Sequence, residues 1–153
     1  MGFTIAQGLM LVLLIASTMA ISTARPFGNS HNTQTSNKII VGDSYHWNYG
    51  FNYTEWAIKH GPFYLNDTLV FKYDPPTPNT NPHNVYLLEN LERFIKCDFT
   101  NAQKVANETQ GGGEGFEFVL ERPWQPHYFA CTVHEGIHCL NGTMKFFVTP
   151  ICH

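Results

Sequence analysis

Short apolar or alternating runs, separated by turn-forming residues, recur along the chain from residue 39 onward. Six of these runs predict β-strands, at residues 39–41, 69–73, 84–88, 116–120, 128–131 and 144–148. A proline pair (75–76) and a glycine triplet (111–113) stand between them, where the chain must turn. Several short strands with turn signals between them are typical of an all-β sandwich or barrel.

Two further segments, 55–59 and 88–94, have the composition of one or two helical turns. Before the first strand, residues 25–37 are polar and have no periodicity, so we expect a loose lead-in to the domain. We therefore expect one domain over residues 38–150, followed by a short tail at 151–153.

An apolar run at residues 9–16 lies near the start of the chain and leads to the small residues 22–24. The run is too short for a comfortable transmembrane helix, and small residues suit a signal peptidase. The pattern predicts a signal peptide over 1–24, with cleavage after Ala24 favoured and Ala20 second. No second apolar stretch predicts a membrane span or a lipid anchor.

Composition and charge narrow the function further. The chain has 153 residues, enough for one domain with a real core, and a net charge of −3 with 14% charged residues. It has no cluster of Lys and Arg, so nucleic acid is not an expected partner. Four sequons favour a secretory route and predict surface glycans, at Asn52, Asn66, Asn107 and Asn141.

The residues that carry chemistry concentrate late in the chain. Cys131 ends one predicted strand, His138 follows in a loop, and Met144 opens the next strand. A type 1 copper site needs one thiolate and two imidazoles in a near-trigonal plane, with a weak axial donor. One loop can supply Cys, His and Met, and His83 is the obvious source of the second imidazole.

At this point the sequence resembles the phytocyanins, the plant cupredoxins that include stellacyanins, plantacyanins, uclacyanins and early nodulin-like proteins. The resemblance covers roughly residues 39–149 and rests on an ordered set of motifs, found at 41–43, 56–57, 66–73, 83–85, 97, 128–131, 138–139 and 142–145. It implies a cupredoxin-type two-sheet Greek-key β-sandwich with one type 1 copper.

The resemblance also implies the site residues. His83, Cys131 and His138 would be the equatorial ligands, and Cys97 and Cys139 would form a disulfide that pins the ligand loop. The late histidine lies near the surface in the family, so we expect His138 to be the electron port.

The ligand loop departs from the family's usual spacing. Residues 132–137 separate Cys131 from His138, and 139–143 separate His138 from Met144, so both intervals are longer than usual. Counting forward from His138 puts Thr143 in the axial position, whereas counting back from residue 145 puts Met144 there. We favour Met144, because a thioether is a soft donor and a hydroxyl is a poor one. His134, three residues after Cys131, is a rival to His138.

The fourth cysteine, Cys152, lies outside the family pattern. A pairing with Cys131 is disfavoured, since seven or so extended residues span roughly 20 Å and a disulfide needs Cα atoms within about 7 Å. Cys152 is then an odd thiol that is capped, free or bonded to another chain.

We therefore expect a secreted protein of the extracellular space or cell wall that carries single electrons and catalyses nothing itself. Its redox partner, a protein or a small redox molecule, is not identified by the sequence. The first alternative is an early nodulin-like structural or signalling module with an altered or empty copper site. The second, an enzyme that uses Cys131 with His134 or His138 as a nucleophile pair, lacks any sign of a third orienting group.

Overall fold

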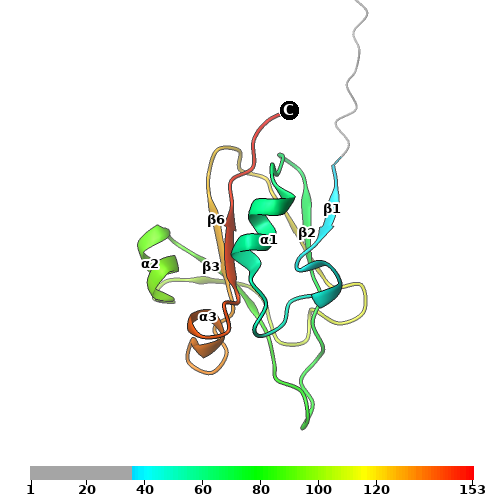
Figure 1. Cartoon of the computed structure of the whole chain (residues 1–153), viewed down its shortest axis with the longest axis vertical. Coiled ribbons are helices and arrows are strands. Elements are labelled where there is room, and N and C mark those ends of the chain that lie inside the picture. Colours follow the sequence, from blue (N-terminus) through cyan, green and yellow to red (C-terminus); the bar gives the residue numbers. More distant parts are fainter. Residues whose placement is uncertain (1–35) are drawn as a thin grey trace, which may run out of the picture. The chain divides into compact units, whose positions relative to one another are not determined.

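The computed structural model describes residues 36–153, which form two β-sheets with three short α-helices around them (Figure 1). The predicted signal peptide, 1–24, and nearly all of the predicted lead-in lie outside the described residues. Among the described residues, no helix is both long and apolar enough to cross a membrane.

The first sheet has the order β1-β2-β5. Its strands are β1 (Lys38–Ile40), β2 (Thr68–Phe71) and β5 (Phe116–Val119). The pair β1 and β2 is parallel, with Ile39 beside Leu69, whereas β2 and β5 are antiparallel. All four residues of β2 are buried, as expected for the central strand of a covered sheet.

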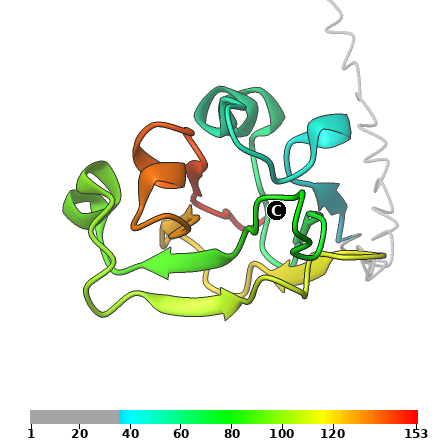
Figure 2. The same cartoon turned by 90° about the horizontal axis from the view of Figure 1, so that it is seen from below.

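The second sheet has the order β4-β3-β6-β7 and is antiparallel throughout. Its strands are β4 (Gln103–Ala106), β3 (Val85–Leu88), β6 (His127–Ala130) and β7 (Lys145–Val148). Figure 2 shows β3 and β4 running side by side in opposite directions. The predicted all-β, two-sheet architecture is confirmed.

An aromatic core fills the space between the sheets. Trp47 and Phe71 are fully buried with ring centroids 5.3 Å apart, and Phe129 and Phe146 continue the cluster at 5.2 Å from each other. Such edge-to-face and offset pairs are stabilising beyond the area that they bury. The core therefore joins β2 of one sheet to β6 and β7 of the other.

Helix α1 (Tyr53–His60) covers β7, and its sequence explains its limits. The Asn52 side chain accepts a hydrogen bond from the Glu55 N–H at 3.0 Å, which is a helix N-cap. Tyr53, Trp56 and Ala57, at helical spacing, are the buried residues. The helix ends before Gly61–Pro62, where proline disfavours helix in the residue that precedes it.

The structure departs from the predicted elements in three places. The strand β4 was not predicted, because it is a sheet edge whose first two residues are exposed and polar. The predicted helical segment 88–94 lies later, in α2 (Leu91–Lys96), since Leu88 is the last residue of β3. The third helix, α3 (Ile137–Leu140), lies inside the predicted ligand loop.

The end of the chain is part of the domain. The Ile151 N–H donates to the Phe63 carbonyl at 3.0 Å, the Leu65 N–H donates to the Ile151 carbonyl at 2.9 Å, and the His153 ring stacks on Tyr64 at 3.8 Å. Strand β7 runs away from α3, so the C-terminus lies at the end of the domain opposite to α3 (Figure 1).

Candidate metal centre

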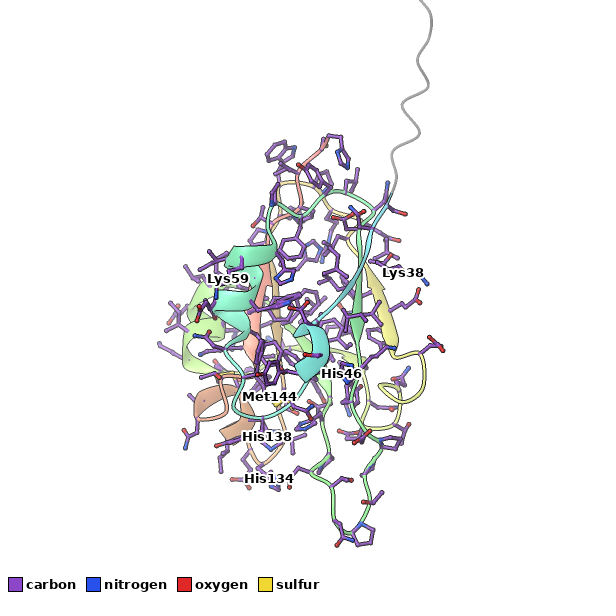
Figure 3. The ribbon with its side chains drawn as sticks, turned by 45° about the vertical axis from the view of Figure 1, so that its right-hand side comes forward. Lys38, His46, Lys59, His134, His138 and Met144 are labelled. Atoms are coloured by element: carbon purple, nitrogen blue, oxygen red, sulfur yellow. A yellow bond between two sulfur atoms is a disulfide. The ribbon has the colours of Figure 1, made fainter. Side chains whose placement is uncertain are left out.

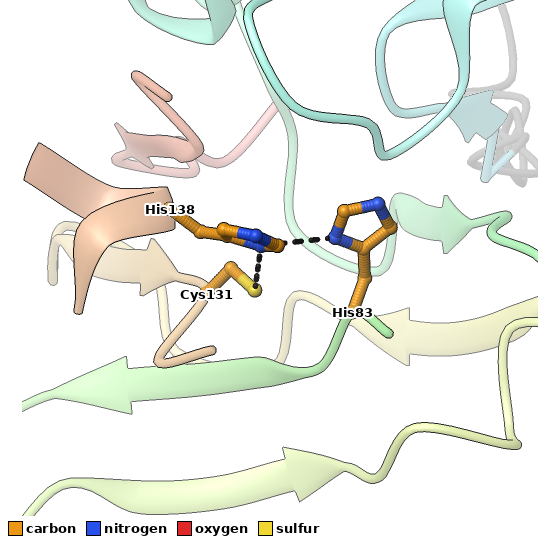
Figure 4. Close-up of side chains that lie close together, drawn as sticks. All are labelled: His83, Cys131 and His138. Atoms are coloured by element: carbon orange, nitrogen blue, oxygen red, sulfur yellow. Dashed lines mark hydrogen bonds between the residues drawn. The ribbon is translucent and has the colours of Figure 1, made fainter. Parts of the chain in front are cut away.

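Strand register brings the two halves of the site together. His83 lies two residues before β3, and Cys131 directly follows β6. Because these strands are antiparallel, with Tyr86 opposite Ala130, the start of β3 lies beside the end of β6. His138, in α3, completes the group from the loop between β6 and β7 (Figure 4).

The ligand atoms of His83, Cys131 and His138 converge, and all lie within 4.8 Å of one another. His138 Nδ1 is 3.2 Å from His83 Nδ1 and 3.5 Å from Cys131 Sγ. Two nitrogens at about 2.0–2.1 Å and a sulfur at about 2.3 Å from one metal ion, at angles between tetrahedral and trigonal, would be about 3.3–3.6 Å apart for the two nitrogens and about 3.5–3.8 Å for nitrogen and sulfur. The spacing therefore fits three donors to one ion.

Burial sets the protonation of the three side chains in the metal-free protein. Burial, followed by the nearby His138, lowers the pKa of His83 to about 4, and burial also lowers the pKa of His138. Burial raises the pKa of the Cys131 thiol to about 11, although the backbone N–H groups of Asn84 and Val133 act in the opposite direction. At neutral pH both imidazoles have a free lone pair, and a metal must displace the thiol proton.

Asn84 joins the two ligand segments. Its side-chain oxygen accepts from the Thr132 N–H, and its amide donates to the Thr132 hydroxyl and to Glu108, each at 2.9 Å. Asn84 is buried, and it follows one ligand while Thr132 follows another. We did not assign it a role from the sequence, where a single asparagine beside a ligand has no distinguishing pattern.

A disulfide fixes the third ligand. Cys97 and Cys139, the pair that the resemblance implies, are bonded with their Cα atoms 5.9 Å apart. Cys97 ends α2 in the left-handed conformation and Cys139 is the neighbour of His138 in α3. Both cysteines are buried with Phe94 and Tyr128. The bond therefore ties the ligand helix to α2.

The two axial alternatives lie in different surroundings. Met144 is fully buried in the same core cluster as Cys131, and the Cys131 N–H donates to the Met144 carbonyl at 3.0 Å. Thr143 is exposed, and its hydroxyl donates to the Phe51 carbonyl at 2.8 Å. Because Thr143 is exposed whereas Met144 is buried in the cluster that holds Cys131, the arrangement favours Met144, whose axial role stays a prediction.

His134 lies outside the converged group. It is exposed, and its ring centroid is 5.1 Å from that of His138. Figure 3 shows Met144, His138 and His134 in that order toward one end of the domain. His134 is thus a neighbour of the site on its solvent side, and His138 is the histidine that meets Cys131.

His138 itself is only 2% exposed. Tyr49 packs edge-on against its ring with centroids 5.3 Å apart, and the Gly50 N–H donates to the Gly142 carbonyl at 2.9 Å. A Cβ at Gly142 would come within 2.4 Å of the Tyr49 ring, so the two segments pack with no room for a side chain there. Our sequence analysis did not identify Tyr49 as part of the site.

The remaining predicted residues lie on the surface. The asparagines of the four sequons, Asn52, Asn66, Asn107 and Asn141, are exposed, and their glycosylation stays a prediction. Cys152 is an exposed free thiol, and Cys131 is a buried one, so the two are not bonded to each other.

Comparison with known proteins gives a consistent result. The plastocyanin-like domain family matches residues 46–143. The chain is 33% identical to cucumber peeling cupredoxin of Cucumis sativus over 108 residues, 67% of this chain and 68% of that protein. It is 39% identical to early nodulin-like protein 17 of Arabidopsis thaliana over 138 residues, 90% of this chain and 69% of that protein.

A solved structure shares the fold. Cucumber stellacyanin with Cu²⁺ superposes with a TM-score of 0.58 at 28% identity, and the match covers 78% of this chain and 99% of that one. The cupredoxin fold predicted from the sequence is therefore confirmed.

Proposed function

The chain belongs to the plastocyanin-like domain family, and from this premise we propose that it is a secreted type 1 copper protein that transfers single electrons. The observation that carries the proposal is the convergence of two imidazoles and one thiol within 4.8 Å. Two imidazoles and one thiolate, with a thioether nearby, are the donors of blue copper sites.

The protein's own residues would hold the ion and limit its movement. His83, Cys131 and His138 would be the equatorial ligands, and copper would supply the one-electron Cu(II)/Cu(I) change. The ligands come from a strand start, a strand end and a disulfide-bonded helix, all packed into the core. Such supports restrict the rearrangement that accompanies a change of oxidation state.

Outer-sphere electron transfer needs no position for a substrate on the metal itself. Cys131 is fully buried, and the residues His83 and His138 are 5% and 2% exposed. A buried thiol with a raised pKa is a poor nucleophile, because the thiolate is the reactive form. These features support outer-sphere electron transfer without catalysis.

The test is a visible spectrum of the purified protein after addition of Cu(II). We expect an intense absorption band at about 600 nm, the copper–thiolate signature of a blue site. Cys131→Ser should abolish the band and Cys152→Ser, at the other free cysteine, should leave it unchanged. A protein that stays colourless, or a band that survives Cys131→Ser, would refute the copper proposal.

Transfer and secretion need their own measurements. We expect reversible one-electron voltammetry of the copper-loaded protein. The N-terminal sequence of the protein recovered from the medium should begin at Arg25 or, for the second cleavage site, at Ile21.

The similarity to early nodulin-like protein 17 favours a second candidate, an extracellular structural or signalling module without copper. The two candidates make opposite predictions for the spectrum. A colourless, folded protein whose Cys131 thiol reacts only after unfolding would support the second one.

A further inference from the structure

A surface pocket of about 260 Å³ reaches the candidate metal centre from the His83 side. It is lined by Asn48, Tyr49, Asp74, Thr80, Asn81 and His83. His83 is the only one of these residues that belongs to the converged ligand group. The pocket is therefore a path from solvent to one ligand.

The ring of His83 is oriented for such a path. Its Nδ1 faces His138 Nδ1 at 3.2 Å, on the side of the candidate metal. The other ring nitrogen, Nε2, points away from His138 (Figure 4). Because the ring is conjugated, an electron that enters at the Nε2 edge reaches Nδ1 without crossing a gap.

His138 is covered by neighbouring side chains. Tyr49 packs on its ring at 5.3 Å, His134 packs on it at 5.1 Å, and the Gly50–Gly142 hydrogen bond holds the two loops together. Tyr49 itself is 50% exposed, so its ring separates His138 from solvent while it also forms one wall of the His83 pocket.

The lining of the pocket sets the chemistry of its ligand. Amides and hydroxyls supply donors and acceptors, and Asp74 supplies the charge. Within residues 36–153, the Asp74 carboxylate has no hydrogen bond or ion pair. A free carboxylate accepts hydrogen bonds from hydroxyl groups and repels anions.

We propose that the imidazole edge of His83, rather than that of His138, is the electron port, and that its pocket admits a small neutral diphenol as electron donor. The proposal rests on the proposed copper function. A cavity of about 150 Å³ suffices for benzene in another protein, so a single hydroxylated ring fits. A hydroxyl donates to Asp74, and the ring lies between Tyr49 and His83.

The reaction balances without a bond to the protein. The diphenol would give one electron through the His83 ring, and copper held by the ligands would supply the one-electron acceptor. Its phenolic proton passes to Asp74 and then to water, and the donor leaves as the one-electron-oxidised radical.

The first test measures the rate at which hydroquinone bleaches the blue band. Asn81→Trp, which fills the pocket, should slow bleaching several-fold, and Leu140→Trp, an equally bulky change at an exposed residue of α3, should not. Asp74→Asn should slow bleaching by hydroquinone. It should accelerate bleaching by the anion hexacyanoferrate(II) by about two- to fivefold, as removal of one nearby negative charge predicts. Circular dichroism and the reduction potential of each variant control for folding and driving force.

The second test needs no copper. Hydroquinone added to metal-free, ¹⁵N-labelled protein should shift the backbone amides of Asn48 and Asn81 in a saturable manner. Slower bleaching in Leu140→Trp than in Asn81→Trp, or shifts confined to residues 137–142, would overturn the proposal. A protein without a blue band would remove the proposed function, and the amide shifts would still decide whether the pocket binds the diphenol.

Discussion

Replacement of Asn84 by alanine would remove the side chain that connects the segment of His83 to the segment of Cys131. Asn84 is 3% exposed, and its amide makes three hydrogen bonds of 2.9 Å, two to Thr132 and one to Glu108. Alanine leaves the Thr132 N–H without this partner in a partly buried position. The change therefore acts on the support of the ligand loop and leaves every ligand in place.

The magnitude follows from the three bonds. A net contribution of about 1 kcal/mol for each gives a loss of about 3 kcal/mol in the free energy of unfolding, and the range of single bonds allows about 1.5–4.5 kcal/mol. Since each 1.4 kcal/mol is about a tenfold change in an equilibrium constant, unfolding becomes about a hundredfold more favourable.

The effect depends on pH through Glu108. The hydrogen bond from Asn84 is the largest cause that lowers the pKa of Glu108 in the folded protein. A carboxyl group whose pKa is lower in the folded than in the unfolded protein stabilises the fold at pH values above its unfolded-state pKa, which is about 4.3 for Glu. That contribution is lost as the pH falls through the folded pKa. The difference between wild type and Asn84→Ala should therefore be largest near neutral pH and should narrow below about pH 4.

The assay is urea unfolding of the metal-free protein, followed by tryptophan fluorescence. The midpoint should fall by about 1–3 M for the slopes usual in small domains. The matched control is Asn79→Ala, at an exposed asparagine whose side chain has no hydrogen bond within residues 36–153. Its unfolding midpoint should fall by much less. A loss below about 1 kcal/mol, or one equal to that of the control, would refute the argument.

Three further outcomes are expected. Met144→Leu conserves side-chain volume, so it should cost less than about 1.5 kcal/mol of stability. It should still shift the blue absorption band and the reduction potential. Unchanged optical and redox properties would exclude an axial thioether. At pH values between the His83 pKa of about 4 and the Cys131 pKa of about 11, one thiol proton must leave when the metal binds. Calorimetry in buffers of different ionisation enthalpy should therefore count one proton released per Cu(II), and the affinity should rise about tenfold per pH unit. A pH-independent affinity would contradict this. Replacement of both Cys97 and Cys139 by alanine opens a loop with a sequence separation of 42 and should cost about 4 kcal/mol by the chain-entropy estimate; an unchanged denaturation midpoint would contradict that role.

Much of the fold was predictable because its strands have clear alternation or apolar runs. Strand β2, for example, is buried on both faces and stands out as an apolar segment between turns. Strand β4 was not predictable in this way, since its first two residues, Gln103 and Lys104, are polar and face solvent. Local patterns therefore identify strands with apolar or alternating residues, whether central or at an edge, better than strands that begin with polar residues.

The residues of the site likewise fall into those that the sequence predicted and those that it did not. Cys131, His138 and His83 carry the chemistry of a copper site in their side chains, so the residue types alone predicted a ligand set. The roles of Asn84 and Tyr49 depend on contacts between segments far apart in the chain, Asn84 with Thr132 and Tyr49 with His138. Such contacts exist only after the sheets have formed, and no local spacing records them.

The antiparallel pairing of β6 with β7 has a practical consequence for how the molecule can be attached to a surface. Ala130 pairs with Lys145 near the ligands, and His127 pairs with Val148 toward the C-terminus. An electrode or bead linked through the exposed Cys152 thiol would therefore hold the domain by the end opposite to α3. Every immobilised copy would present the candidate copper end to the solution, and its current would report exchange with dissolved molecules.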